Sequence, residues 1–246
     1  MAHDRGYDKA AHLYDLFDTK DNIPFFLHYA IEAGEILDIG AGTGRIAIPL
    51  AERGVRIFCV EPSLAMRREF LKKLETRSDL AANITLVAAD ARSFDLGRAF
   101  PAVFLSGTFD HFLDAEERLS SVLNIARHLQ PNGKLVFDVF LGLMKDTPLS
   151  PAGRVEQGDR EYRRFVGGSL LPNRTRETIL VFETYEAGAL LERIEERSLV
   201  GIVDRQDVHY LLREAGFEVT REFSNYDSTP FQEGDSLLII EAIREE

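Results

Sequence analysis

The chain has 246 residues, of which 45% are hydrophobic and 28% charged, a composition typical of a globular protein rather than a disordered or fibrous one. Its 41 acidic side chains outnumber 29 basic ones, and the net charge of −12 argues against nucleic acid as a partner. A single cysteine excludes an internal disulfide and a thiolate metal cage. Without an apolar signal core or the roughly 18 apolar residues of a membrane span, we expect a cytoplasmic protein with no membrane partner.

Short apolar runs of strand length alternate with helical patterns through the first 140 residues. Strands are predicted at 36–39, 55–60, 84–88, 102–106 and 134–140, with helices after Gly44, at 63–77 and at 115–129. Ser63 is a suitable N-cap for the second helix. Strand–helix–strand repeats of this length predict a doubly wound α/β fold with a parallel sheet and right-handed crossovers.

The pattern changes after Phe140. Pro148, Pro151 and Gly153 predict a loop, and three antiparallel strands are predicted at 162–166, 175–185 and 190–203, with turns at Gly167-Gly168 and near Ala187-Gly188. We interpret 141–203 as an antiparallel β insertion in a single domain spanning 1–246. A helix at 204–214 and strands at 218–223 and 236–243 complete the chain. The sheet edges of the insertion make a homodimer possible without requiring one.

The segment Asp38-Ile39-Gly40-Ala41-Gly42-Thr43-Gly44-Arg45 ends the first strand and opens a helix. Its glycines let the backbone turn sharply and let a ligand approach with no Cβ in the way. A dinucleotide-binding turn has the spacing G-x-G-x-x-G, whereas here the third glycine comes one residue early and Arg45 stands where that pattern has glycine. Asp38 can bind a cationic amino group, directly or through water. The motif therefore favours S-adenosylmethionine, which carries an ammonium and no pyrophosphate, over NAD.

Two further acidic residues follow the next two strands. Glu61 can accept hydrogen bonds from both ribose hydroxyls of an adenosine, and Asp90 can accept the amino hydrogens of adenine. Each carboxylate alone is also compatible with a solvated loop. Together with Asp38 they place three acidic groups at successive strand ends, along the sheet edge where open α/β folds bind ligands.

These motifs, with segment 104–111 at the fourth strand and 129–133 before the fifth, resemble the Rossmann-like S-adenosylmethionine-dependent methyltransferases over nearly the whole chain. The family often has a second glycine where this chain has Lys134. The resemblance implies a seven-stranded, mostly parallel sheet whose last strand is antiparallel, with the insertion after strand five. The expected cofactor-binding residues are Tyr14, Asp38, Gly40, Gly42, Gly44, Glu61, Pro62, Asp90, Ala91, Arg92 and Ser106.

The N-terminal segment from Tyr7 to Phe17 resembles the opening of small-molecule N-methyltransferases, in particular the amino-sugar N,N-dimethyltransferases. In such enzymes this segment covers the cofactor, so we expect residues 1–30 to form a helical lid with Tyr7 and Tyr14 on one helix face. Ordinary amphipathic packing is the alternative role for both tyrosines. The resemblance implies in-line methyl transfer to a small molecule, at nitrogen.

His111 follows the fourth strand and titrates near neutrality, so His111 and Tyr7 are the catalytic candidates, with a loop histidine of no chemical role as the alternative. A small-molecule O-methyltransferase would need one of them as a base; a non-catalytic S-adenosylmethionine-binding protein would need neither. We expect the insertion to cap the acceptor site, where Tyr7, His111, Arg164 and Arg174 are the substrate-binding candidates, although surface ion pairing is the commoner role of such arginines. The other histidines share no ligand spacing, so we expect no metal.

Overall fold

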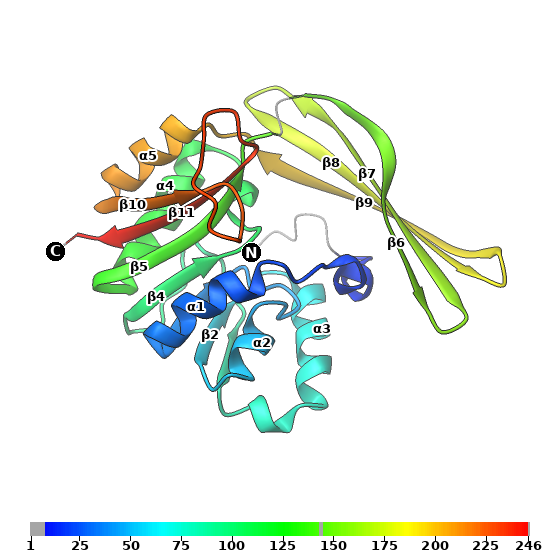
Figure 1. The fold of residues 1–246 in the computed structure, drawn as a ribbon, viewed down its shortest axis with the longest axis horizontal. Coiled ribbons are helices and arrows are strands. Elements are labelled where there is room, and N and C mark those ends of the chain that lie inside the picture. The colour runs from blue at the N-terminus through cyan, green and yellow to red at the C-terminus, as the bar shows by residue number, and fades with distance from the viewer. Residues whose placement is uncertain (1–7, 143–144, 246) are drawn as a thin grey trace.

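The computed structural model describes residues 8–142 and 145–245, which form two separate sheets (Figure 1). The strands of the larger sheet are β1 (Glu35–Ile39), β2 (Arg56–Val60), β3 (Ile84–Val87), β4 (Phe100–Leu105), β5 (Leu129–Phe140), β10 (Phe217–Phe223) and β11 (Leu237–Arg244). The strands of the smaller sheet are β6 (Thr147–Gln157), β7 (Arg160–Leu171), β8 (Thr175–Glu186) and β9 (Ala189–Gly201). The helices are α1 (Ile23–Ala33), α2 (Ala47–Ala51), α3 (Leu64–Glu75), α4 (Ala115–Arg127) and α5 (Arg205–Glu214), with short 3-10 turns η1 (Ala11–Phe17), η2 (Ser78–Leu80) and η3 (Phe109–His111).

The larger sheet has the order β10-β11-β5-β4-β1-β2-β3. Its pairings from β3 through β5 are parallel, and β11 pairs antiparallel with both β5 and β10. The predicted seven-stranded sheet with an antiparallel last strand is thereby confirmed. Parallel strands bring their carboxyl ends to one edge, which positions the candidate site.

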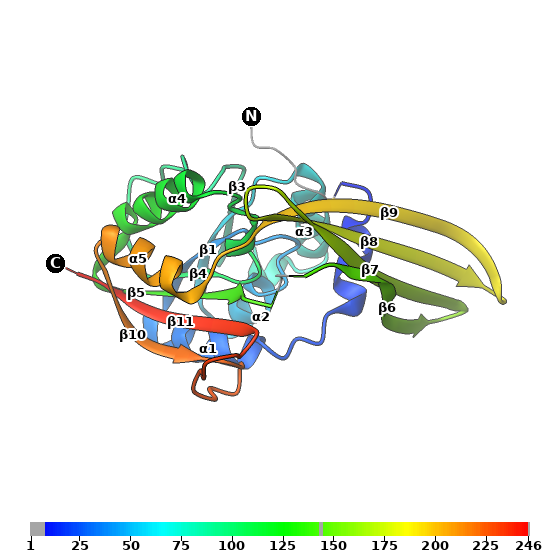
Figure 2. The ribbon, with the colours of Figure 1, turned by 90° about the horizontal axis from the view of Figure 1, so that it is seen from above.

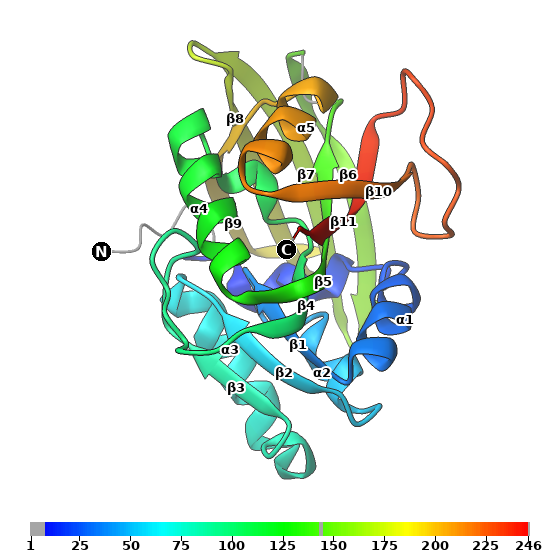
Figure 3. The ribbon, with the colours of Figure 1, turned by 90° about the vertical axis from the view of Figure 1, so that its left-hand side faces the viewer.

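Alternate residues of the central strands pack against opposite helix layers, as a doubly wound sheet requires. In β1, Ile36 joins the core beneath α1 and α2, whereas Leu37 joins the core beneath α4 and α5. Both side chains are fully buried. Figure 3 shows the sheet lying between these two layers. Ser63 is the N-cap of α3 as predicted, since its hydroxyl accepts a hydrogen bond from the Met66 amide at 3.2 Å.

The smaller sheet is the antiparallel insertion after β5, and Figure 2 shows it extending away from the larger sheet. It has four strands rather than the three predicted, because β6 replaces the loop expected around Pro148 and Pro151. β6 lies at the sheet edge, where a proline's missing N–H removes no necessary hydrogen bond, and its register with β7 shifts twice. The prolines thus marked an edge strand.

The turn expected at Gly167-Gly168 is also wrong, because β7 runs through both residues. A Cβ added to Gly167 would lie 2.8 Å from the Leu149 backbone, and one added to Gly168 would lie 2.4 Å from the Glu177 carbonyl oxygen. These glycines therefore permit close strand approach instead of a chain reversal. The turn predicted near Ala187-Gly188 is confirmed between β8 and β9.

The described part of the expected lid region 1–30, residues 8–30, divides into two parts in the structure. η1 contacts α3 on one side and β6 on the other, whereas α1 packs into the core, where Phe26 is fully buried. Tyr7 lies outside the described residues. Within the described part of the chain, no helix is long and apolar enough to cross a membrane.

Candidate active site

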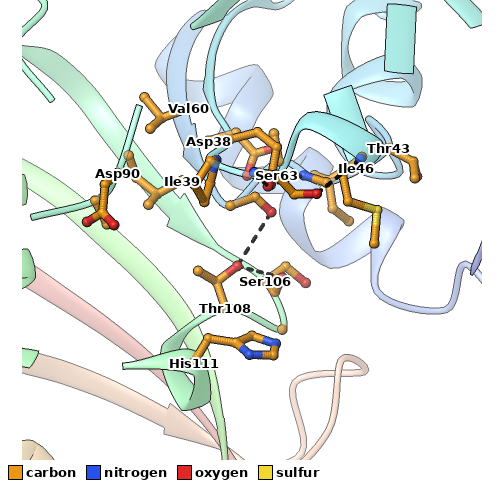
Figure 4. Close-up of a pocket in the computed structure, with 18 of the residues that line it drawn as sticks. Asp38, Ile39, Thr43, Ile46, Val60, Ser63, Asp90, Ser106, Thr108 and His111 are labelled. Atoms are coloured by element: carbon orange, nitrogen blue, oxygen red, sulfur yellow. Dashed lines mark hydrogen bonds between the residues drawn. The ribbon is translucent and has the colours of Figure 1, made fainter. Parts of the chain in front are cut away.

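A pocket opens at the carboxyl ends of β1, β2 and β4, with η3 and Tyr14 of η1 at its wall (Figure 4). Its empty volume, open mouth included, is about 1100 Å³, which is ample for a small-molecule ligand. The predicted cofactor residues in its lining are Tyr14, Asp38, Gly40, Gly42, Glu61, Pro62, Asp90, Ala91, Arg92 and Ser106. The remaining one, Gly44, is not a lining residue.

The three glycines of the turn are required for different structural reasons. All have positive φ, at 72° for Gly40, 57° for Gly42 and 81° for Gly44. A Cβ on Gly40 would lie 2.3 Å from the Thr108 hydroxyl oxygen, and one on Gly44 would lie 2.4 Å from the Phe70 ring. A Cβ on Gly42 would meet no atom closer than 3.9 Å. Gly40 and Gly44 therefore serve packing, while Gly42 leaves the backbone open to a ligand.

The carboxylate of Glu61 is fixed by two backbone amides. One oxygen accepts a hydrogen bond from the Gly42 amide at 2.8 Å, and the other accepts one from the Ser63 amide at 2.7 Å. The side chain is only 6% exposed and still lines the pocket. Glu61 thus joins the glycine turn to the beginning of α3, in an orientation set before any ligand arrives.

Asp38 has the most unusual electrostatic position in the pocket. Its side chain is 2% exposed, and its Oδ2 atom has no hydrogen-bond partner among the described residues. Burial raises the pKa of Asp38 to about 7, with Arg45 opposing and Glu61 adding to the rise. A buried carboxylate is stabilised by a cation placed beside it. The site therefore fits a ligand that brings a positive charge to Asp38.

Asp90 lies at the far side of the same pocket (Figure 4). Its two oxygens accept hydrogen bonds from the Arg92 guanidinium at 2.8 and 2.7 Å, and Arg92 also bonds Glu117 at 3.0 Å. The sequence suggested Asp90 as a direct acceptor for an adenine amino group. The structure adds that its orientation is set by Arg92.

The N-terminal turn η1 is anchored to the pocket through Asp15. This carboxylate accepts a hydrogen bond from the Thr43 hydroxyl at 2.6 Å and forms an ion pair with Lys73 of α3. Lys73 also donates to the Thr43 carbonyl oxygen at 2.7 Å. The neighbouring Tyr14 thereby reaches the pocket wall, and burial raises its pKa above the ordinary value.

Ser106 belongs to a hydrogen-bond network that the sequence did not reveal. Its hydroxyl accepts from Asn22 at 3.0 Å and from Arg45 at 3.1 Å, and it donates to Asp138 at 3.2 Å. Asp138 also accepts from the Tyr226 hydroxyl at 2.8 Å. One sequence signal was present, since Asp138 is the acidic residue of the buried run 135–139 in β5, and a buried charge requires donors.

Among the described residues predicted to act in catalysis or acceptor binding, only His111 lines the pocket. His111 lines the pocket near Thr108 (Figure 4), whereas Tyr7 is outside the described residues. Arg164 lies over the Phe17 ring of η1 at 5.1 Å. Arg174 is exposed and forms surface ion pairs with two aspartates at the beginning of α5. In residues 8–142 and 145–245, no group of three or more His, Cys, Asp or Glu side chains is placed to hold a metal ion.

Comparison with known proteins bears on the part of the chain that builds this pocket. Residues 36–133 match the methyltransferase domain family. The cypemycin N-terminal methyltransferase of Streptomyces sp is 26% identical over 224 residues, which cover 87% of this chain and 85% of that protein. An uncharacterized methyltransferase of Bacillus cytotoxicus is 28% identical over 142 residues, which cover 53% of this chain and 64% of that protein.

Solved structures share the fold over almost the full length. An S-adenosylmethionine-dependent methyltransferase from Clostridium acetobutylicum matches with a TM-score of 0.78 and 15% identity, covering 98% of this chain and 99% of its own. The sugar N-methyltransferase KedS8 from Streptoalloteichus sp matches with a TM-score of 0.77 and 22% identity, covering 100% of this chain and 96% of its own. Residues 36–133 thus form a methyltransferase domain, and the chain as a whole has the Rossmann-like fold of solved S-adenosylmethionine-dependent methyltransferases.

Proposed function

We propose that this protein transfers a methyl group from S-adenosylmethionine to a nitrogen atom of a small molecule, with S-adenosylhomocysteine as the second product. The observation that carries the nitrogen assignment is a group of three buried carboxylates near the carboxyl ends of β1, β4 and β5: Asp38, Asp110 and Asp138. Only Asp38 of the three lines the pocket, and burial raises the pKa of Asp38 to about 7 and that of Asp110 to about 8. The region therefore becomes negative as the pH rises, which opposes the alkoxide or phenolate that a hydroxyl acceptor must become and does not oppose a neutral amine.

Three residues are proposed to hold the cofactor. Asp38, with its unpartnered buried oxygen, takes the ammonium, and Glu61 takes the ribose hydroxyls. Asp90, oriented by Arg92, takes the adenine. When bound, S-adenosylmethionine supplies an electrophilic methyl group on a sulfonium. The role of Asp38 has the strongest support of the three, because a cation there satisfies an oxygen, Oδ2, that has no hydrogen-bond partner among the described residues.

The protein's own contribution is to orient the acceptor and to exclude water. Methyl transfer to an amine is mainly a problem of alignment, so a closed and rigid pocket supplies most of the rate. We propose that η1, anchored by Asp15, is the lid and that the insertion β6–β9 caps the acceptor. An amine that arrives protonated must lose its proton first, and His111 is the pocket histidine that can take it. We propose no metal ion in this chemistry.

Arg164 is better placed than Arg174 to contact the acceptor. Its guanidinium lies on Phe17 of the lid and donates to the Ala152 carbonyl oxygen at 3.0 Å, while its buried Nε has no hydrogen-bond partner among the described residues. Arg174, in contrast, is engaged by surface carboxylates. We therefore keep Arg164 as the acceptor-binding candidate of the insertion.

Two relatives support nitrogen as the acceptor atom. The names of the cypemycin enzyme and of KedS8 specify an N-terminal methyltransferase and a sugar N-methyltransferase. Their matches extend beyond the methyltransferase domain and across most of this chain. The two names share an amine acceptor and differ in the scaffold that carries it.

A second candidate function is O-methylation, which the position of His111 in the pocket wall favours. The test is a panel of matched acceptors: an amino sugar against its hydroxyl parent, which differ in the reacting atom, and a peptide with a free N-terminus against the same peptide with its amine blocked by acetylation. Mass spectrometry should detect methyl addition to the amines only. Turnover of hydroxyl acceptors alone, abolished by His111→Ala, would establish O-methylation. Tight S-adenosylhomocysteine binding with no turnover of any acceptor would indicate a non-catalytic binding protein.

A further inference from the structure

The buried carboxylate of Asp138 has three donors beneath the wall of the pocket. The Gly107 amide donates to Oδ1 at 2.6 Å, and the hydroxyls of Tyr226 and Ser106 donate to Oδ2 at 2.8 and 3.2 Å. Asp138 is 1% exposed and does not line the pocket, whereas Ser106 and Gly107 do. Asp138 therefore acts on the pocket through the turn that follows β4.

The Ser106 hydroxyl connects this carboxylate to a cation on the other side. Asn22 and Arg45 both donate to its oxygen, so its hydrogen is the group left to donate to Asp138. Arg45 also donates to the Asn22 side-chain oxygen at 2.7 Å. Asp138 and Arg45 thus form a charge pair bridged by one hydroxyl, and Arg45 is itself a pocket residue.

We propose that ionised Asp138 is a positioning residue for the cofactor, which holds the Ser106–Gly107 turn and Arg45 in their binding arrangement, and that Tyr226 keeps it ionised. Tyr226 belongs to the segment between β10 and β11, far in sequence from every cofactor motif. The inference rests on the proposed cofactor site and is independent of which atom accepts the methyl group.

The charges around Asp138 fix the direction of the effect. Burial raises the pKa of Asp138 above its ordinary value, and the Gly107, Tyr226 and Ser106 hydrogen bonds and the charge of Arg45 oppose that rise. The other charged neighbour is Asp110, whose like charge also disfavours ionisation. Removing the Tyr226 hydroxyl therefore raises the pKa of Asp138 further, and the carboxyl becomes protonated at a higher pH.

The chain contains a matched control. Tyr29 also donates its hydroxyl to a buried carboxylate, Glu241, at 2.7 Å. Both tyrosine rings pack on Phe25, at 5.3 Å for Tyr29 and 5.9 Å for Tyr226. Glu241 does not line the pocket, and its carboxylate accepts hydrogen bonds from the hydroxyls of Tyr29 and Thr220, neither of which lines the pocket. Tyr29→Phe thus repeats the chemical change of Tyr226→Phe at a site apart from the cofactor.

The experiment is calorimetric titration with S-adenosylhomocysteine across a range of pH. For Tyr226→Phe, we expect the acid-side loss of binding to move up by about one to two pH units, since a hydrogen bond to a charged group is worth that much in pKa. Tyr29→Phe should follow the wild type. Asp138→Asn should bind weakly at every pH, and thermal melts should confirm that each variant is folded.

Two results would overturn the proposal: a Tyr226→Phe profile that coincides with those of Tyr29→Phe and the wild type, or wild-type binding by folded Asp138→Asn. Absence of S-adenosylhomocysteine binding by the wild type would overturn it together with the cofactor site. If the wild type binds S-adenosylhomocysteine but methylates no amine, the proposal for Asp138 still holds and only the nitrogen assignment is wrong.

Discussion

Replacing Asp38 with asparagine should weaken cofactor binding while making the protein more stable. The side chain is 2% exposed, has an unpartnered oxygen, and has a pKa raised by burial from 3.8 to about 7. Asparagine keeps the size and one carbonyl oxygen but cannot carry negative charge. The two effects have the same cause, because a carboxylate kept without a partner is a cost to folding that a cationic ligand offsets.

The expected magnitudes follow from the same position. A hydrogen bond to a charged group contributes about 1.5–3 kcal/mol, so the affinity for S-adenosylhomocysteine should fall about 10- to 100-fold. For stability, Asp38 is protonated in both states below pH 3.8 and contributes nothing there. As the pH rises from 3.8 to about 7, the unfolded state ionises first, and the free energy of unfolding falls by up to about 4 kcal/mol. Asp38→Asn removes this loss, so its gain should be present above pH 7 and absent at acid pH.

The binding assay compares S-adenosylhomocysteine with 5′-methylthioadenosine, which lacks the amino-acid group. The substitution should weaken the first ligand and leave the second unchanged, because only the first brings an ammonium to Asp38. Urea unfolding on either side of the Asp38 pKa measures the stability change. The reasoning would be refuted by an equal loss for both ligands, or by a variant less stable than the wild type at alkaline pH.

Other substitutions test the turn, the buried carboxylates and the lid. Gly44→Ala should lower the free energy of unfolding by about 1–2 kcal/mol because of its φ of 81°, and by about 1–3 kcal/mol more because the new Cβ clashes with Phe70. Gly54→Ala, at φ 82° with no atom within 4 Å of the new Cβ, should show only the first loss. Equal losses for the two variants in urea unfolding would contradict this. Asp110→Asn should stabilise the protein increasingly from acid pH up to about pH 8, to which burial raises the pKa of Asp110, and a pH-independent difference in unfolding would argue against it. Asp15→Asn should raise the KM for S-adenosylmethionine about 3- to 10-fold with little change in kcat, and an unchanged KM would remove the lid role.

The sheet was predictable because its strands obey a local rule. Each run around Ile36, Ile57 or Val103 is short, apolar and buried on both faces, so its character is visible without knowledge of its neighbours. β6 is an exception to this rule. A strand can contain Pro148 and Pro151 because it lies at the edge of its sheet, and that edge position cannot be read from the segment itself. The prediction of a turn at the two glycines of β7 was wrong for a related reason. These glycines make room for the backbones of neighbouring strands, which lie elsewhere in the sequence.

The position of the pocket at one edge of the sheet was predictable for the same reason as the sheet. Asp38 lies near the end of β1, and Glu61 and Asp90 follow β2 and β3. Parallel strands bring their carboxyl ends together whatever the rest of the chain does. The anchoring of η1 was not predictable, because Asp15 meets Lys73 only after α3 has packed in place. Sequence spacing carries information on groups that share a sheet edge and little on groups brought together by packing.

Asp138 shows how a single physical rule could have reached further. Asp38 and Asp138 occupy strand positions facing the same side as Ile36 and Val136, beneath α1 and α2. A charge at such a position must either face a ligand or find donors in the protein. We propose that Asp38 meets the first condition, and three donors satisfy the second for Asp138. Because one of those donors, Tyr226, is far away in sequence, the rule reveals the need for a partner while only the folded chain reveals which partner meets it.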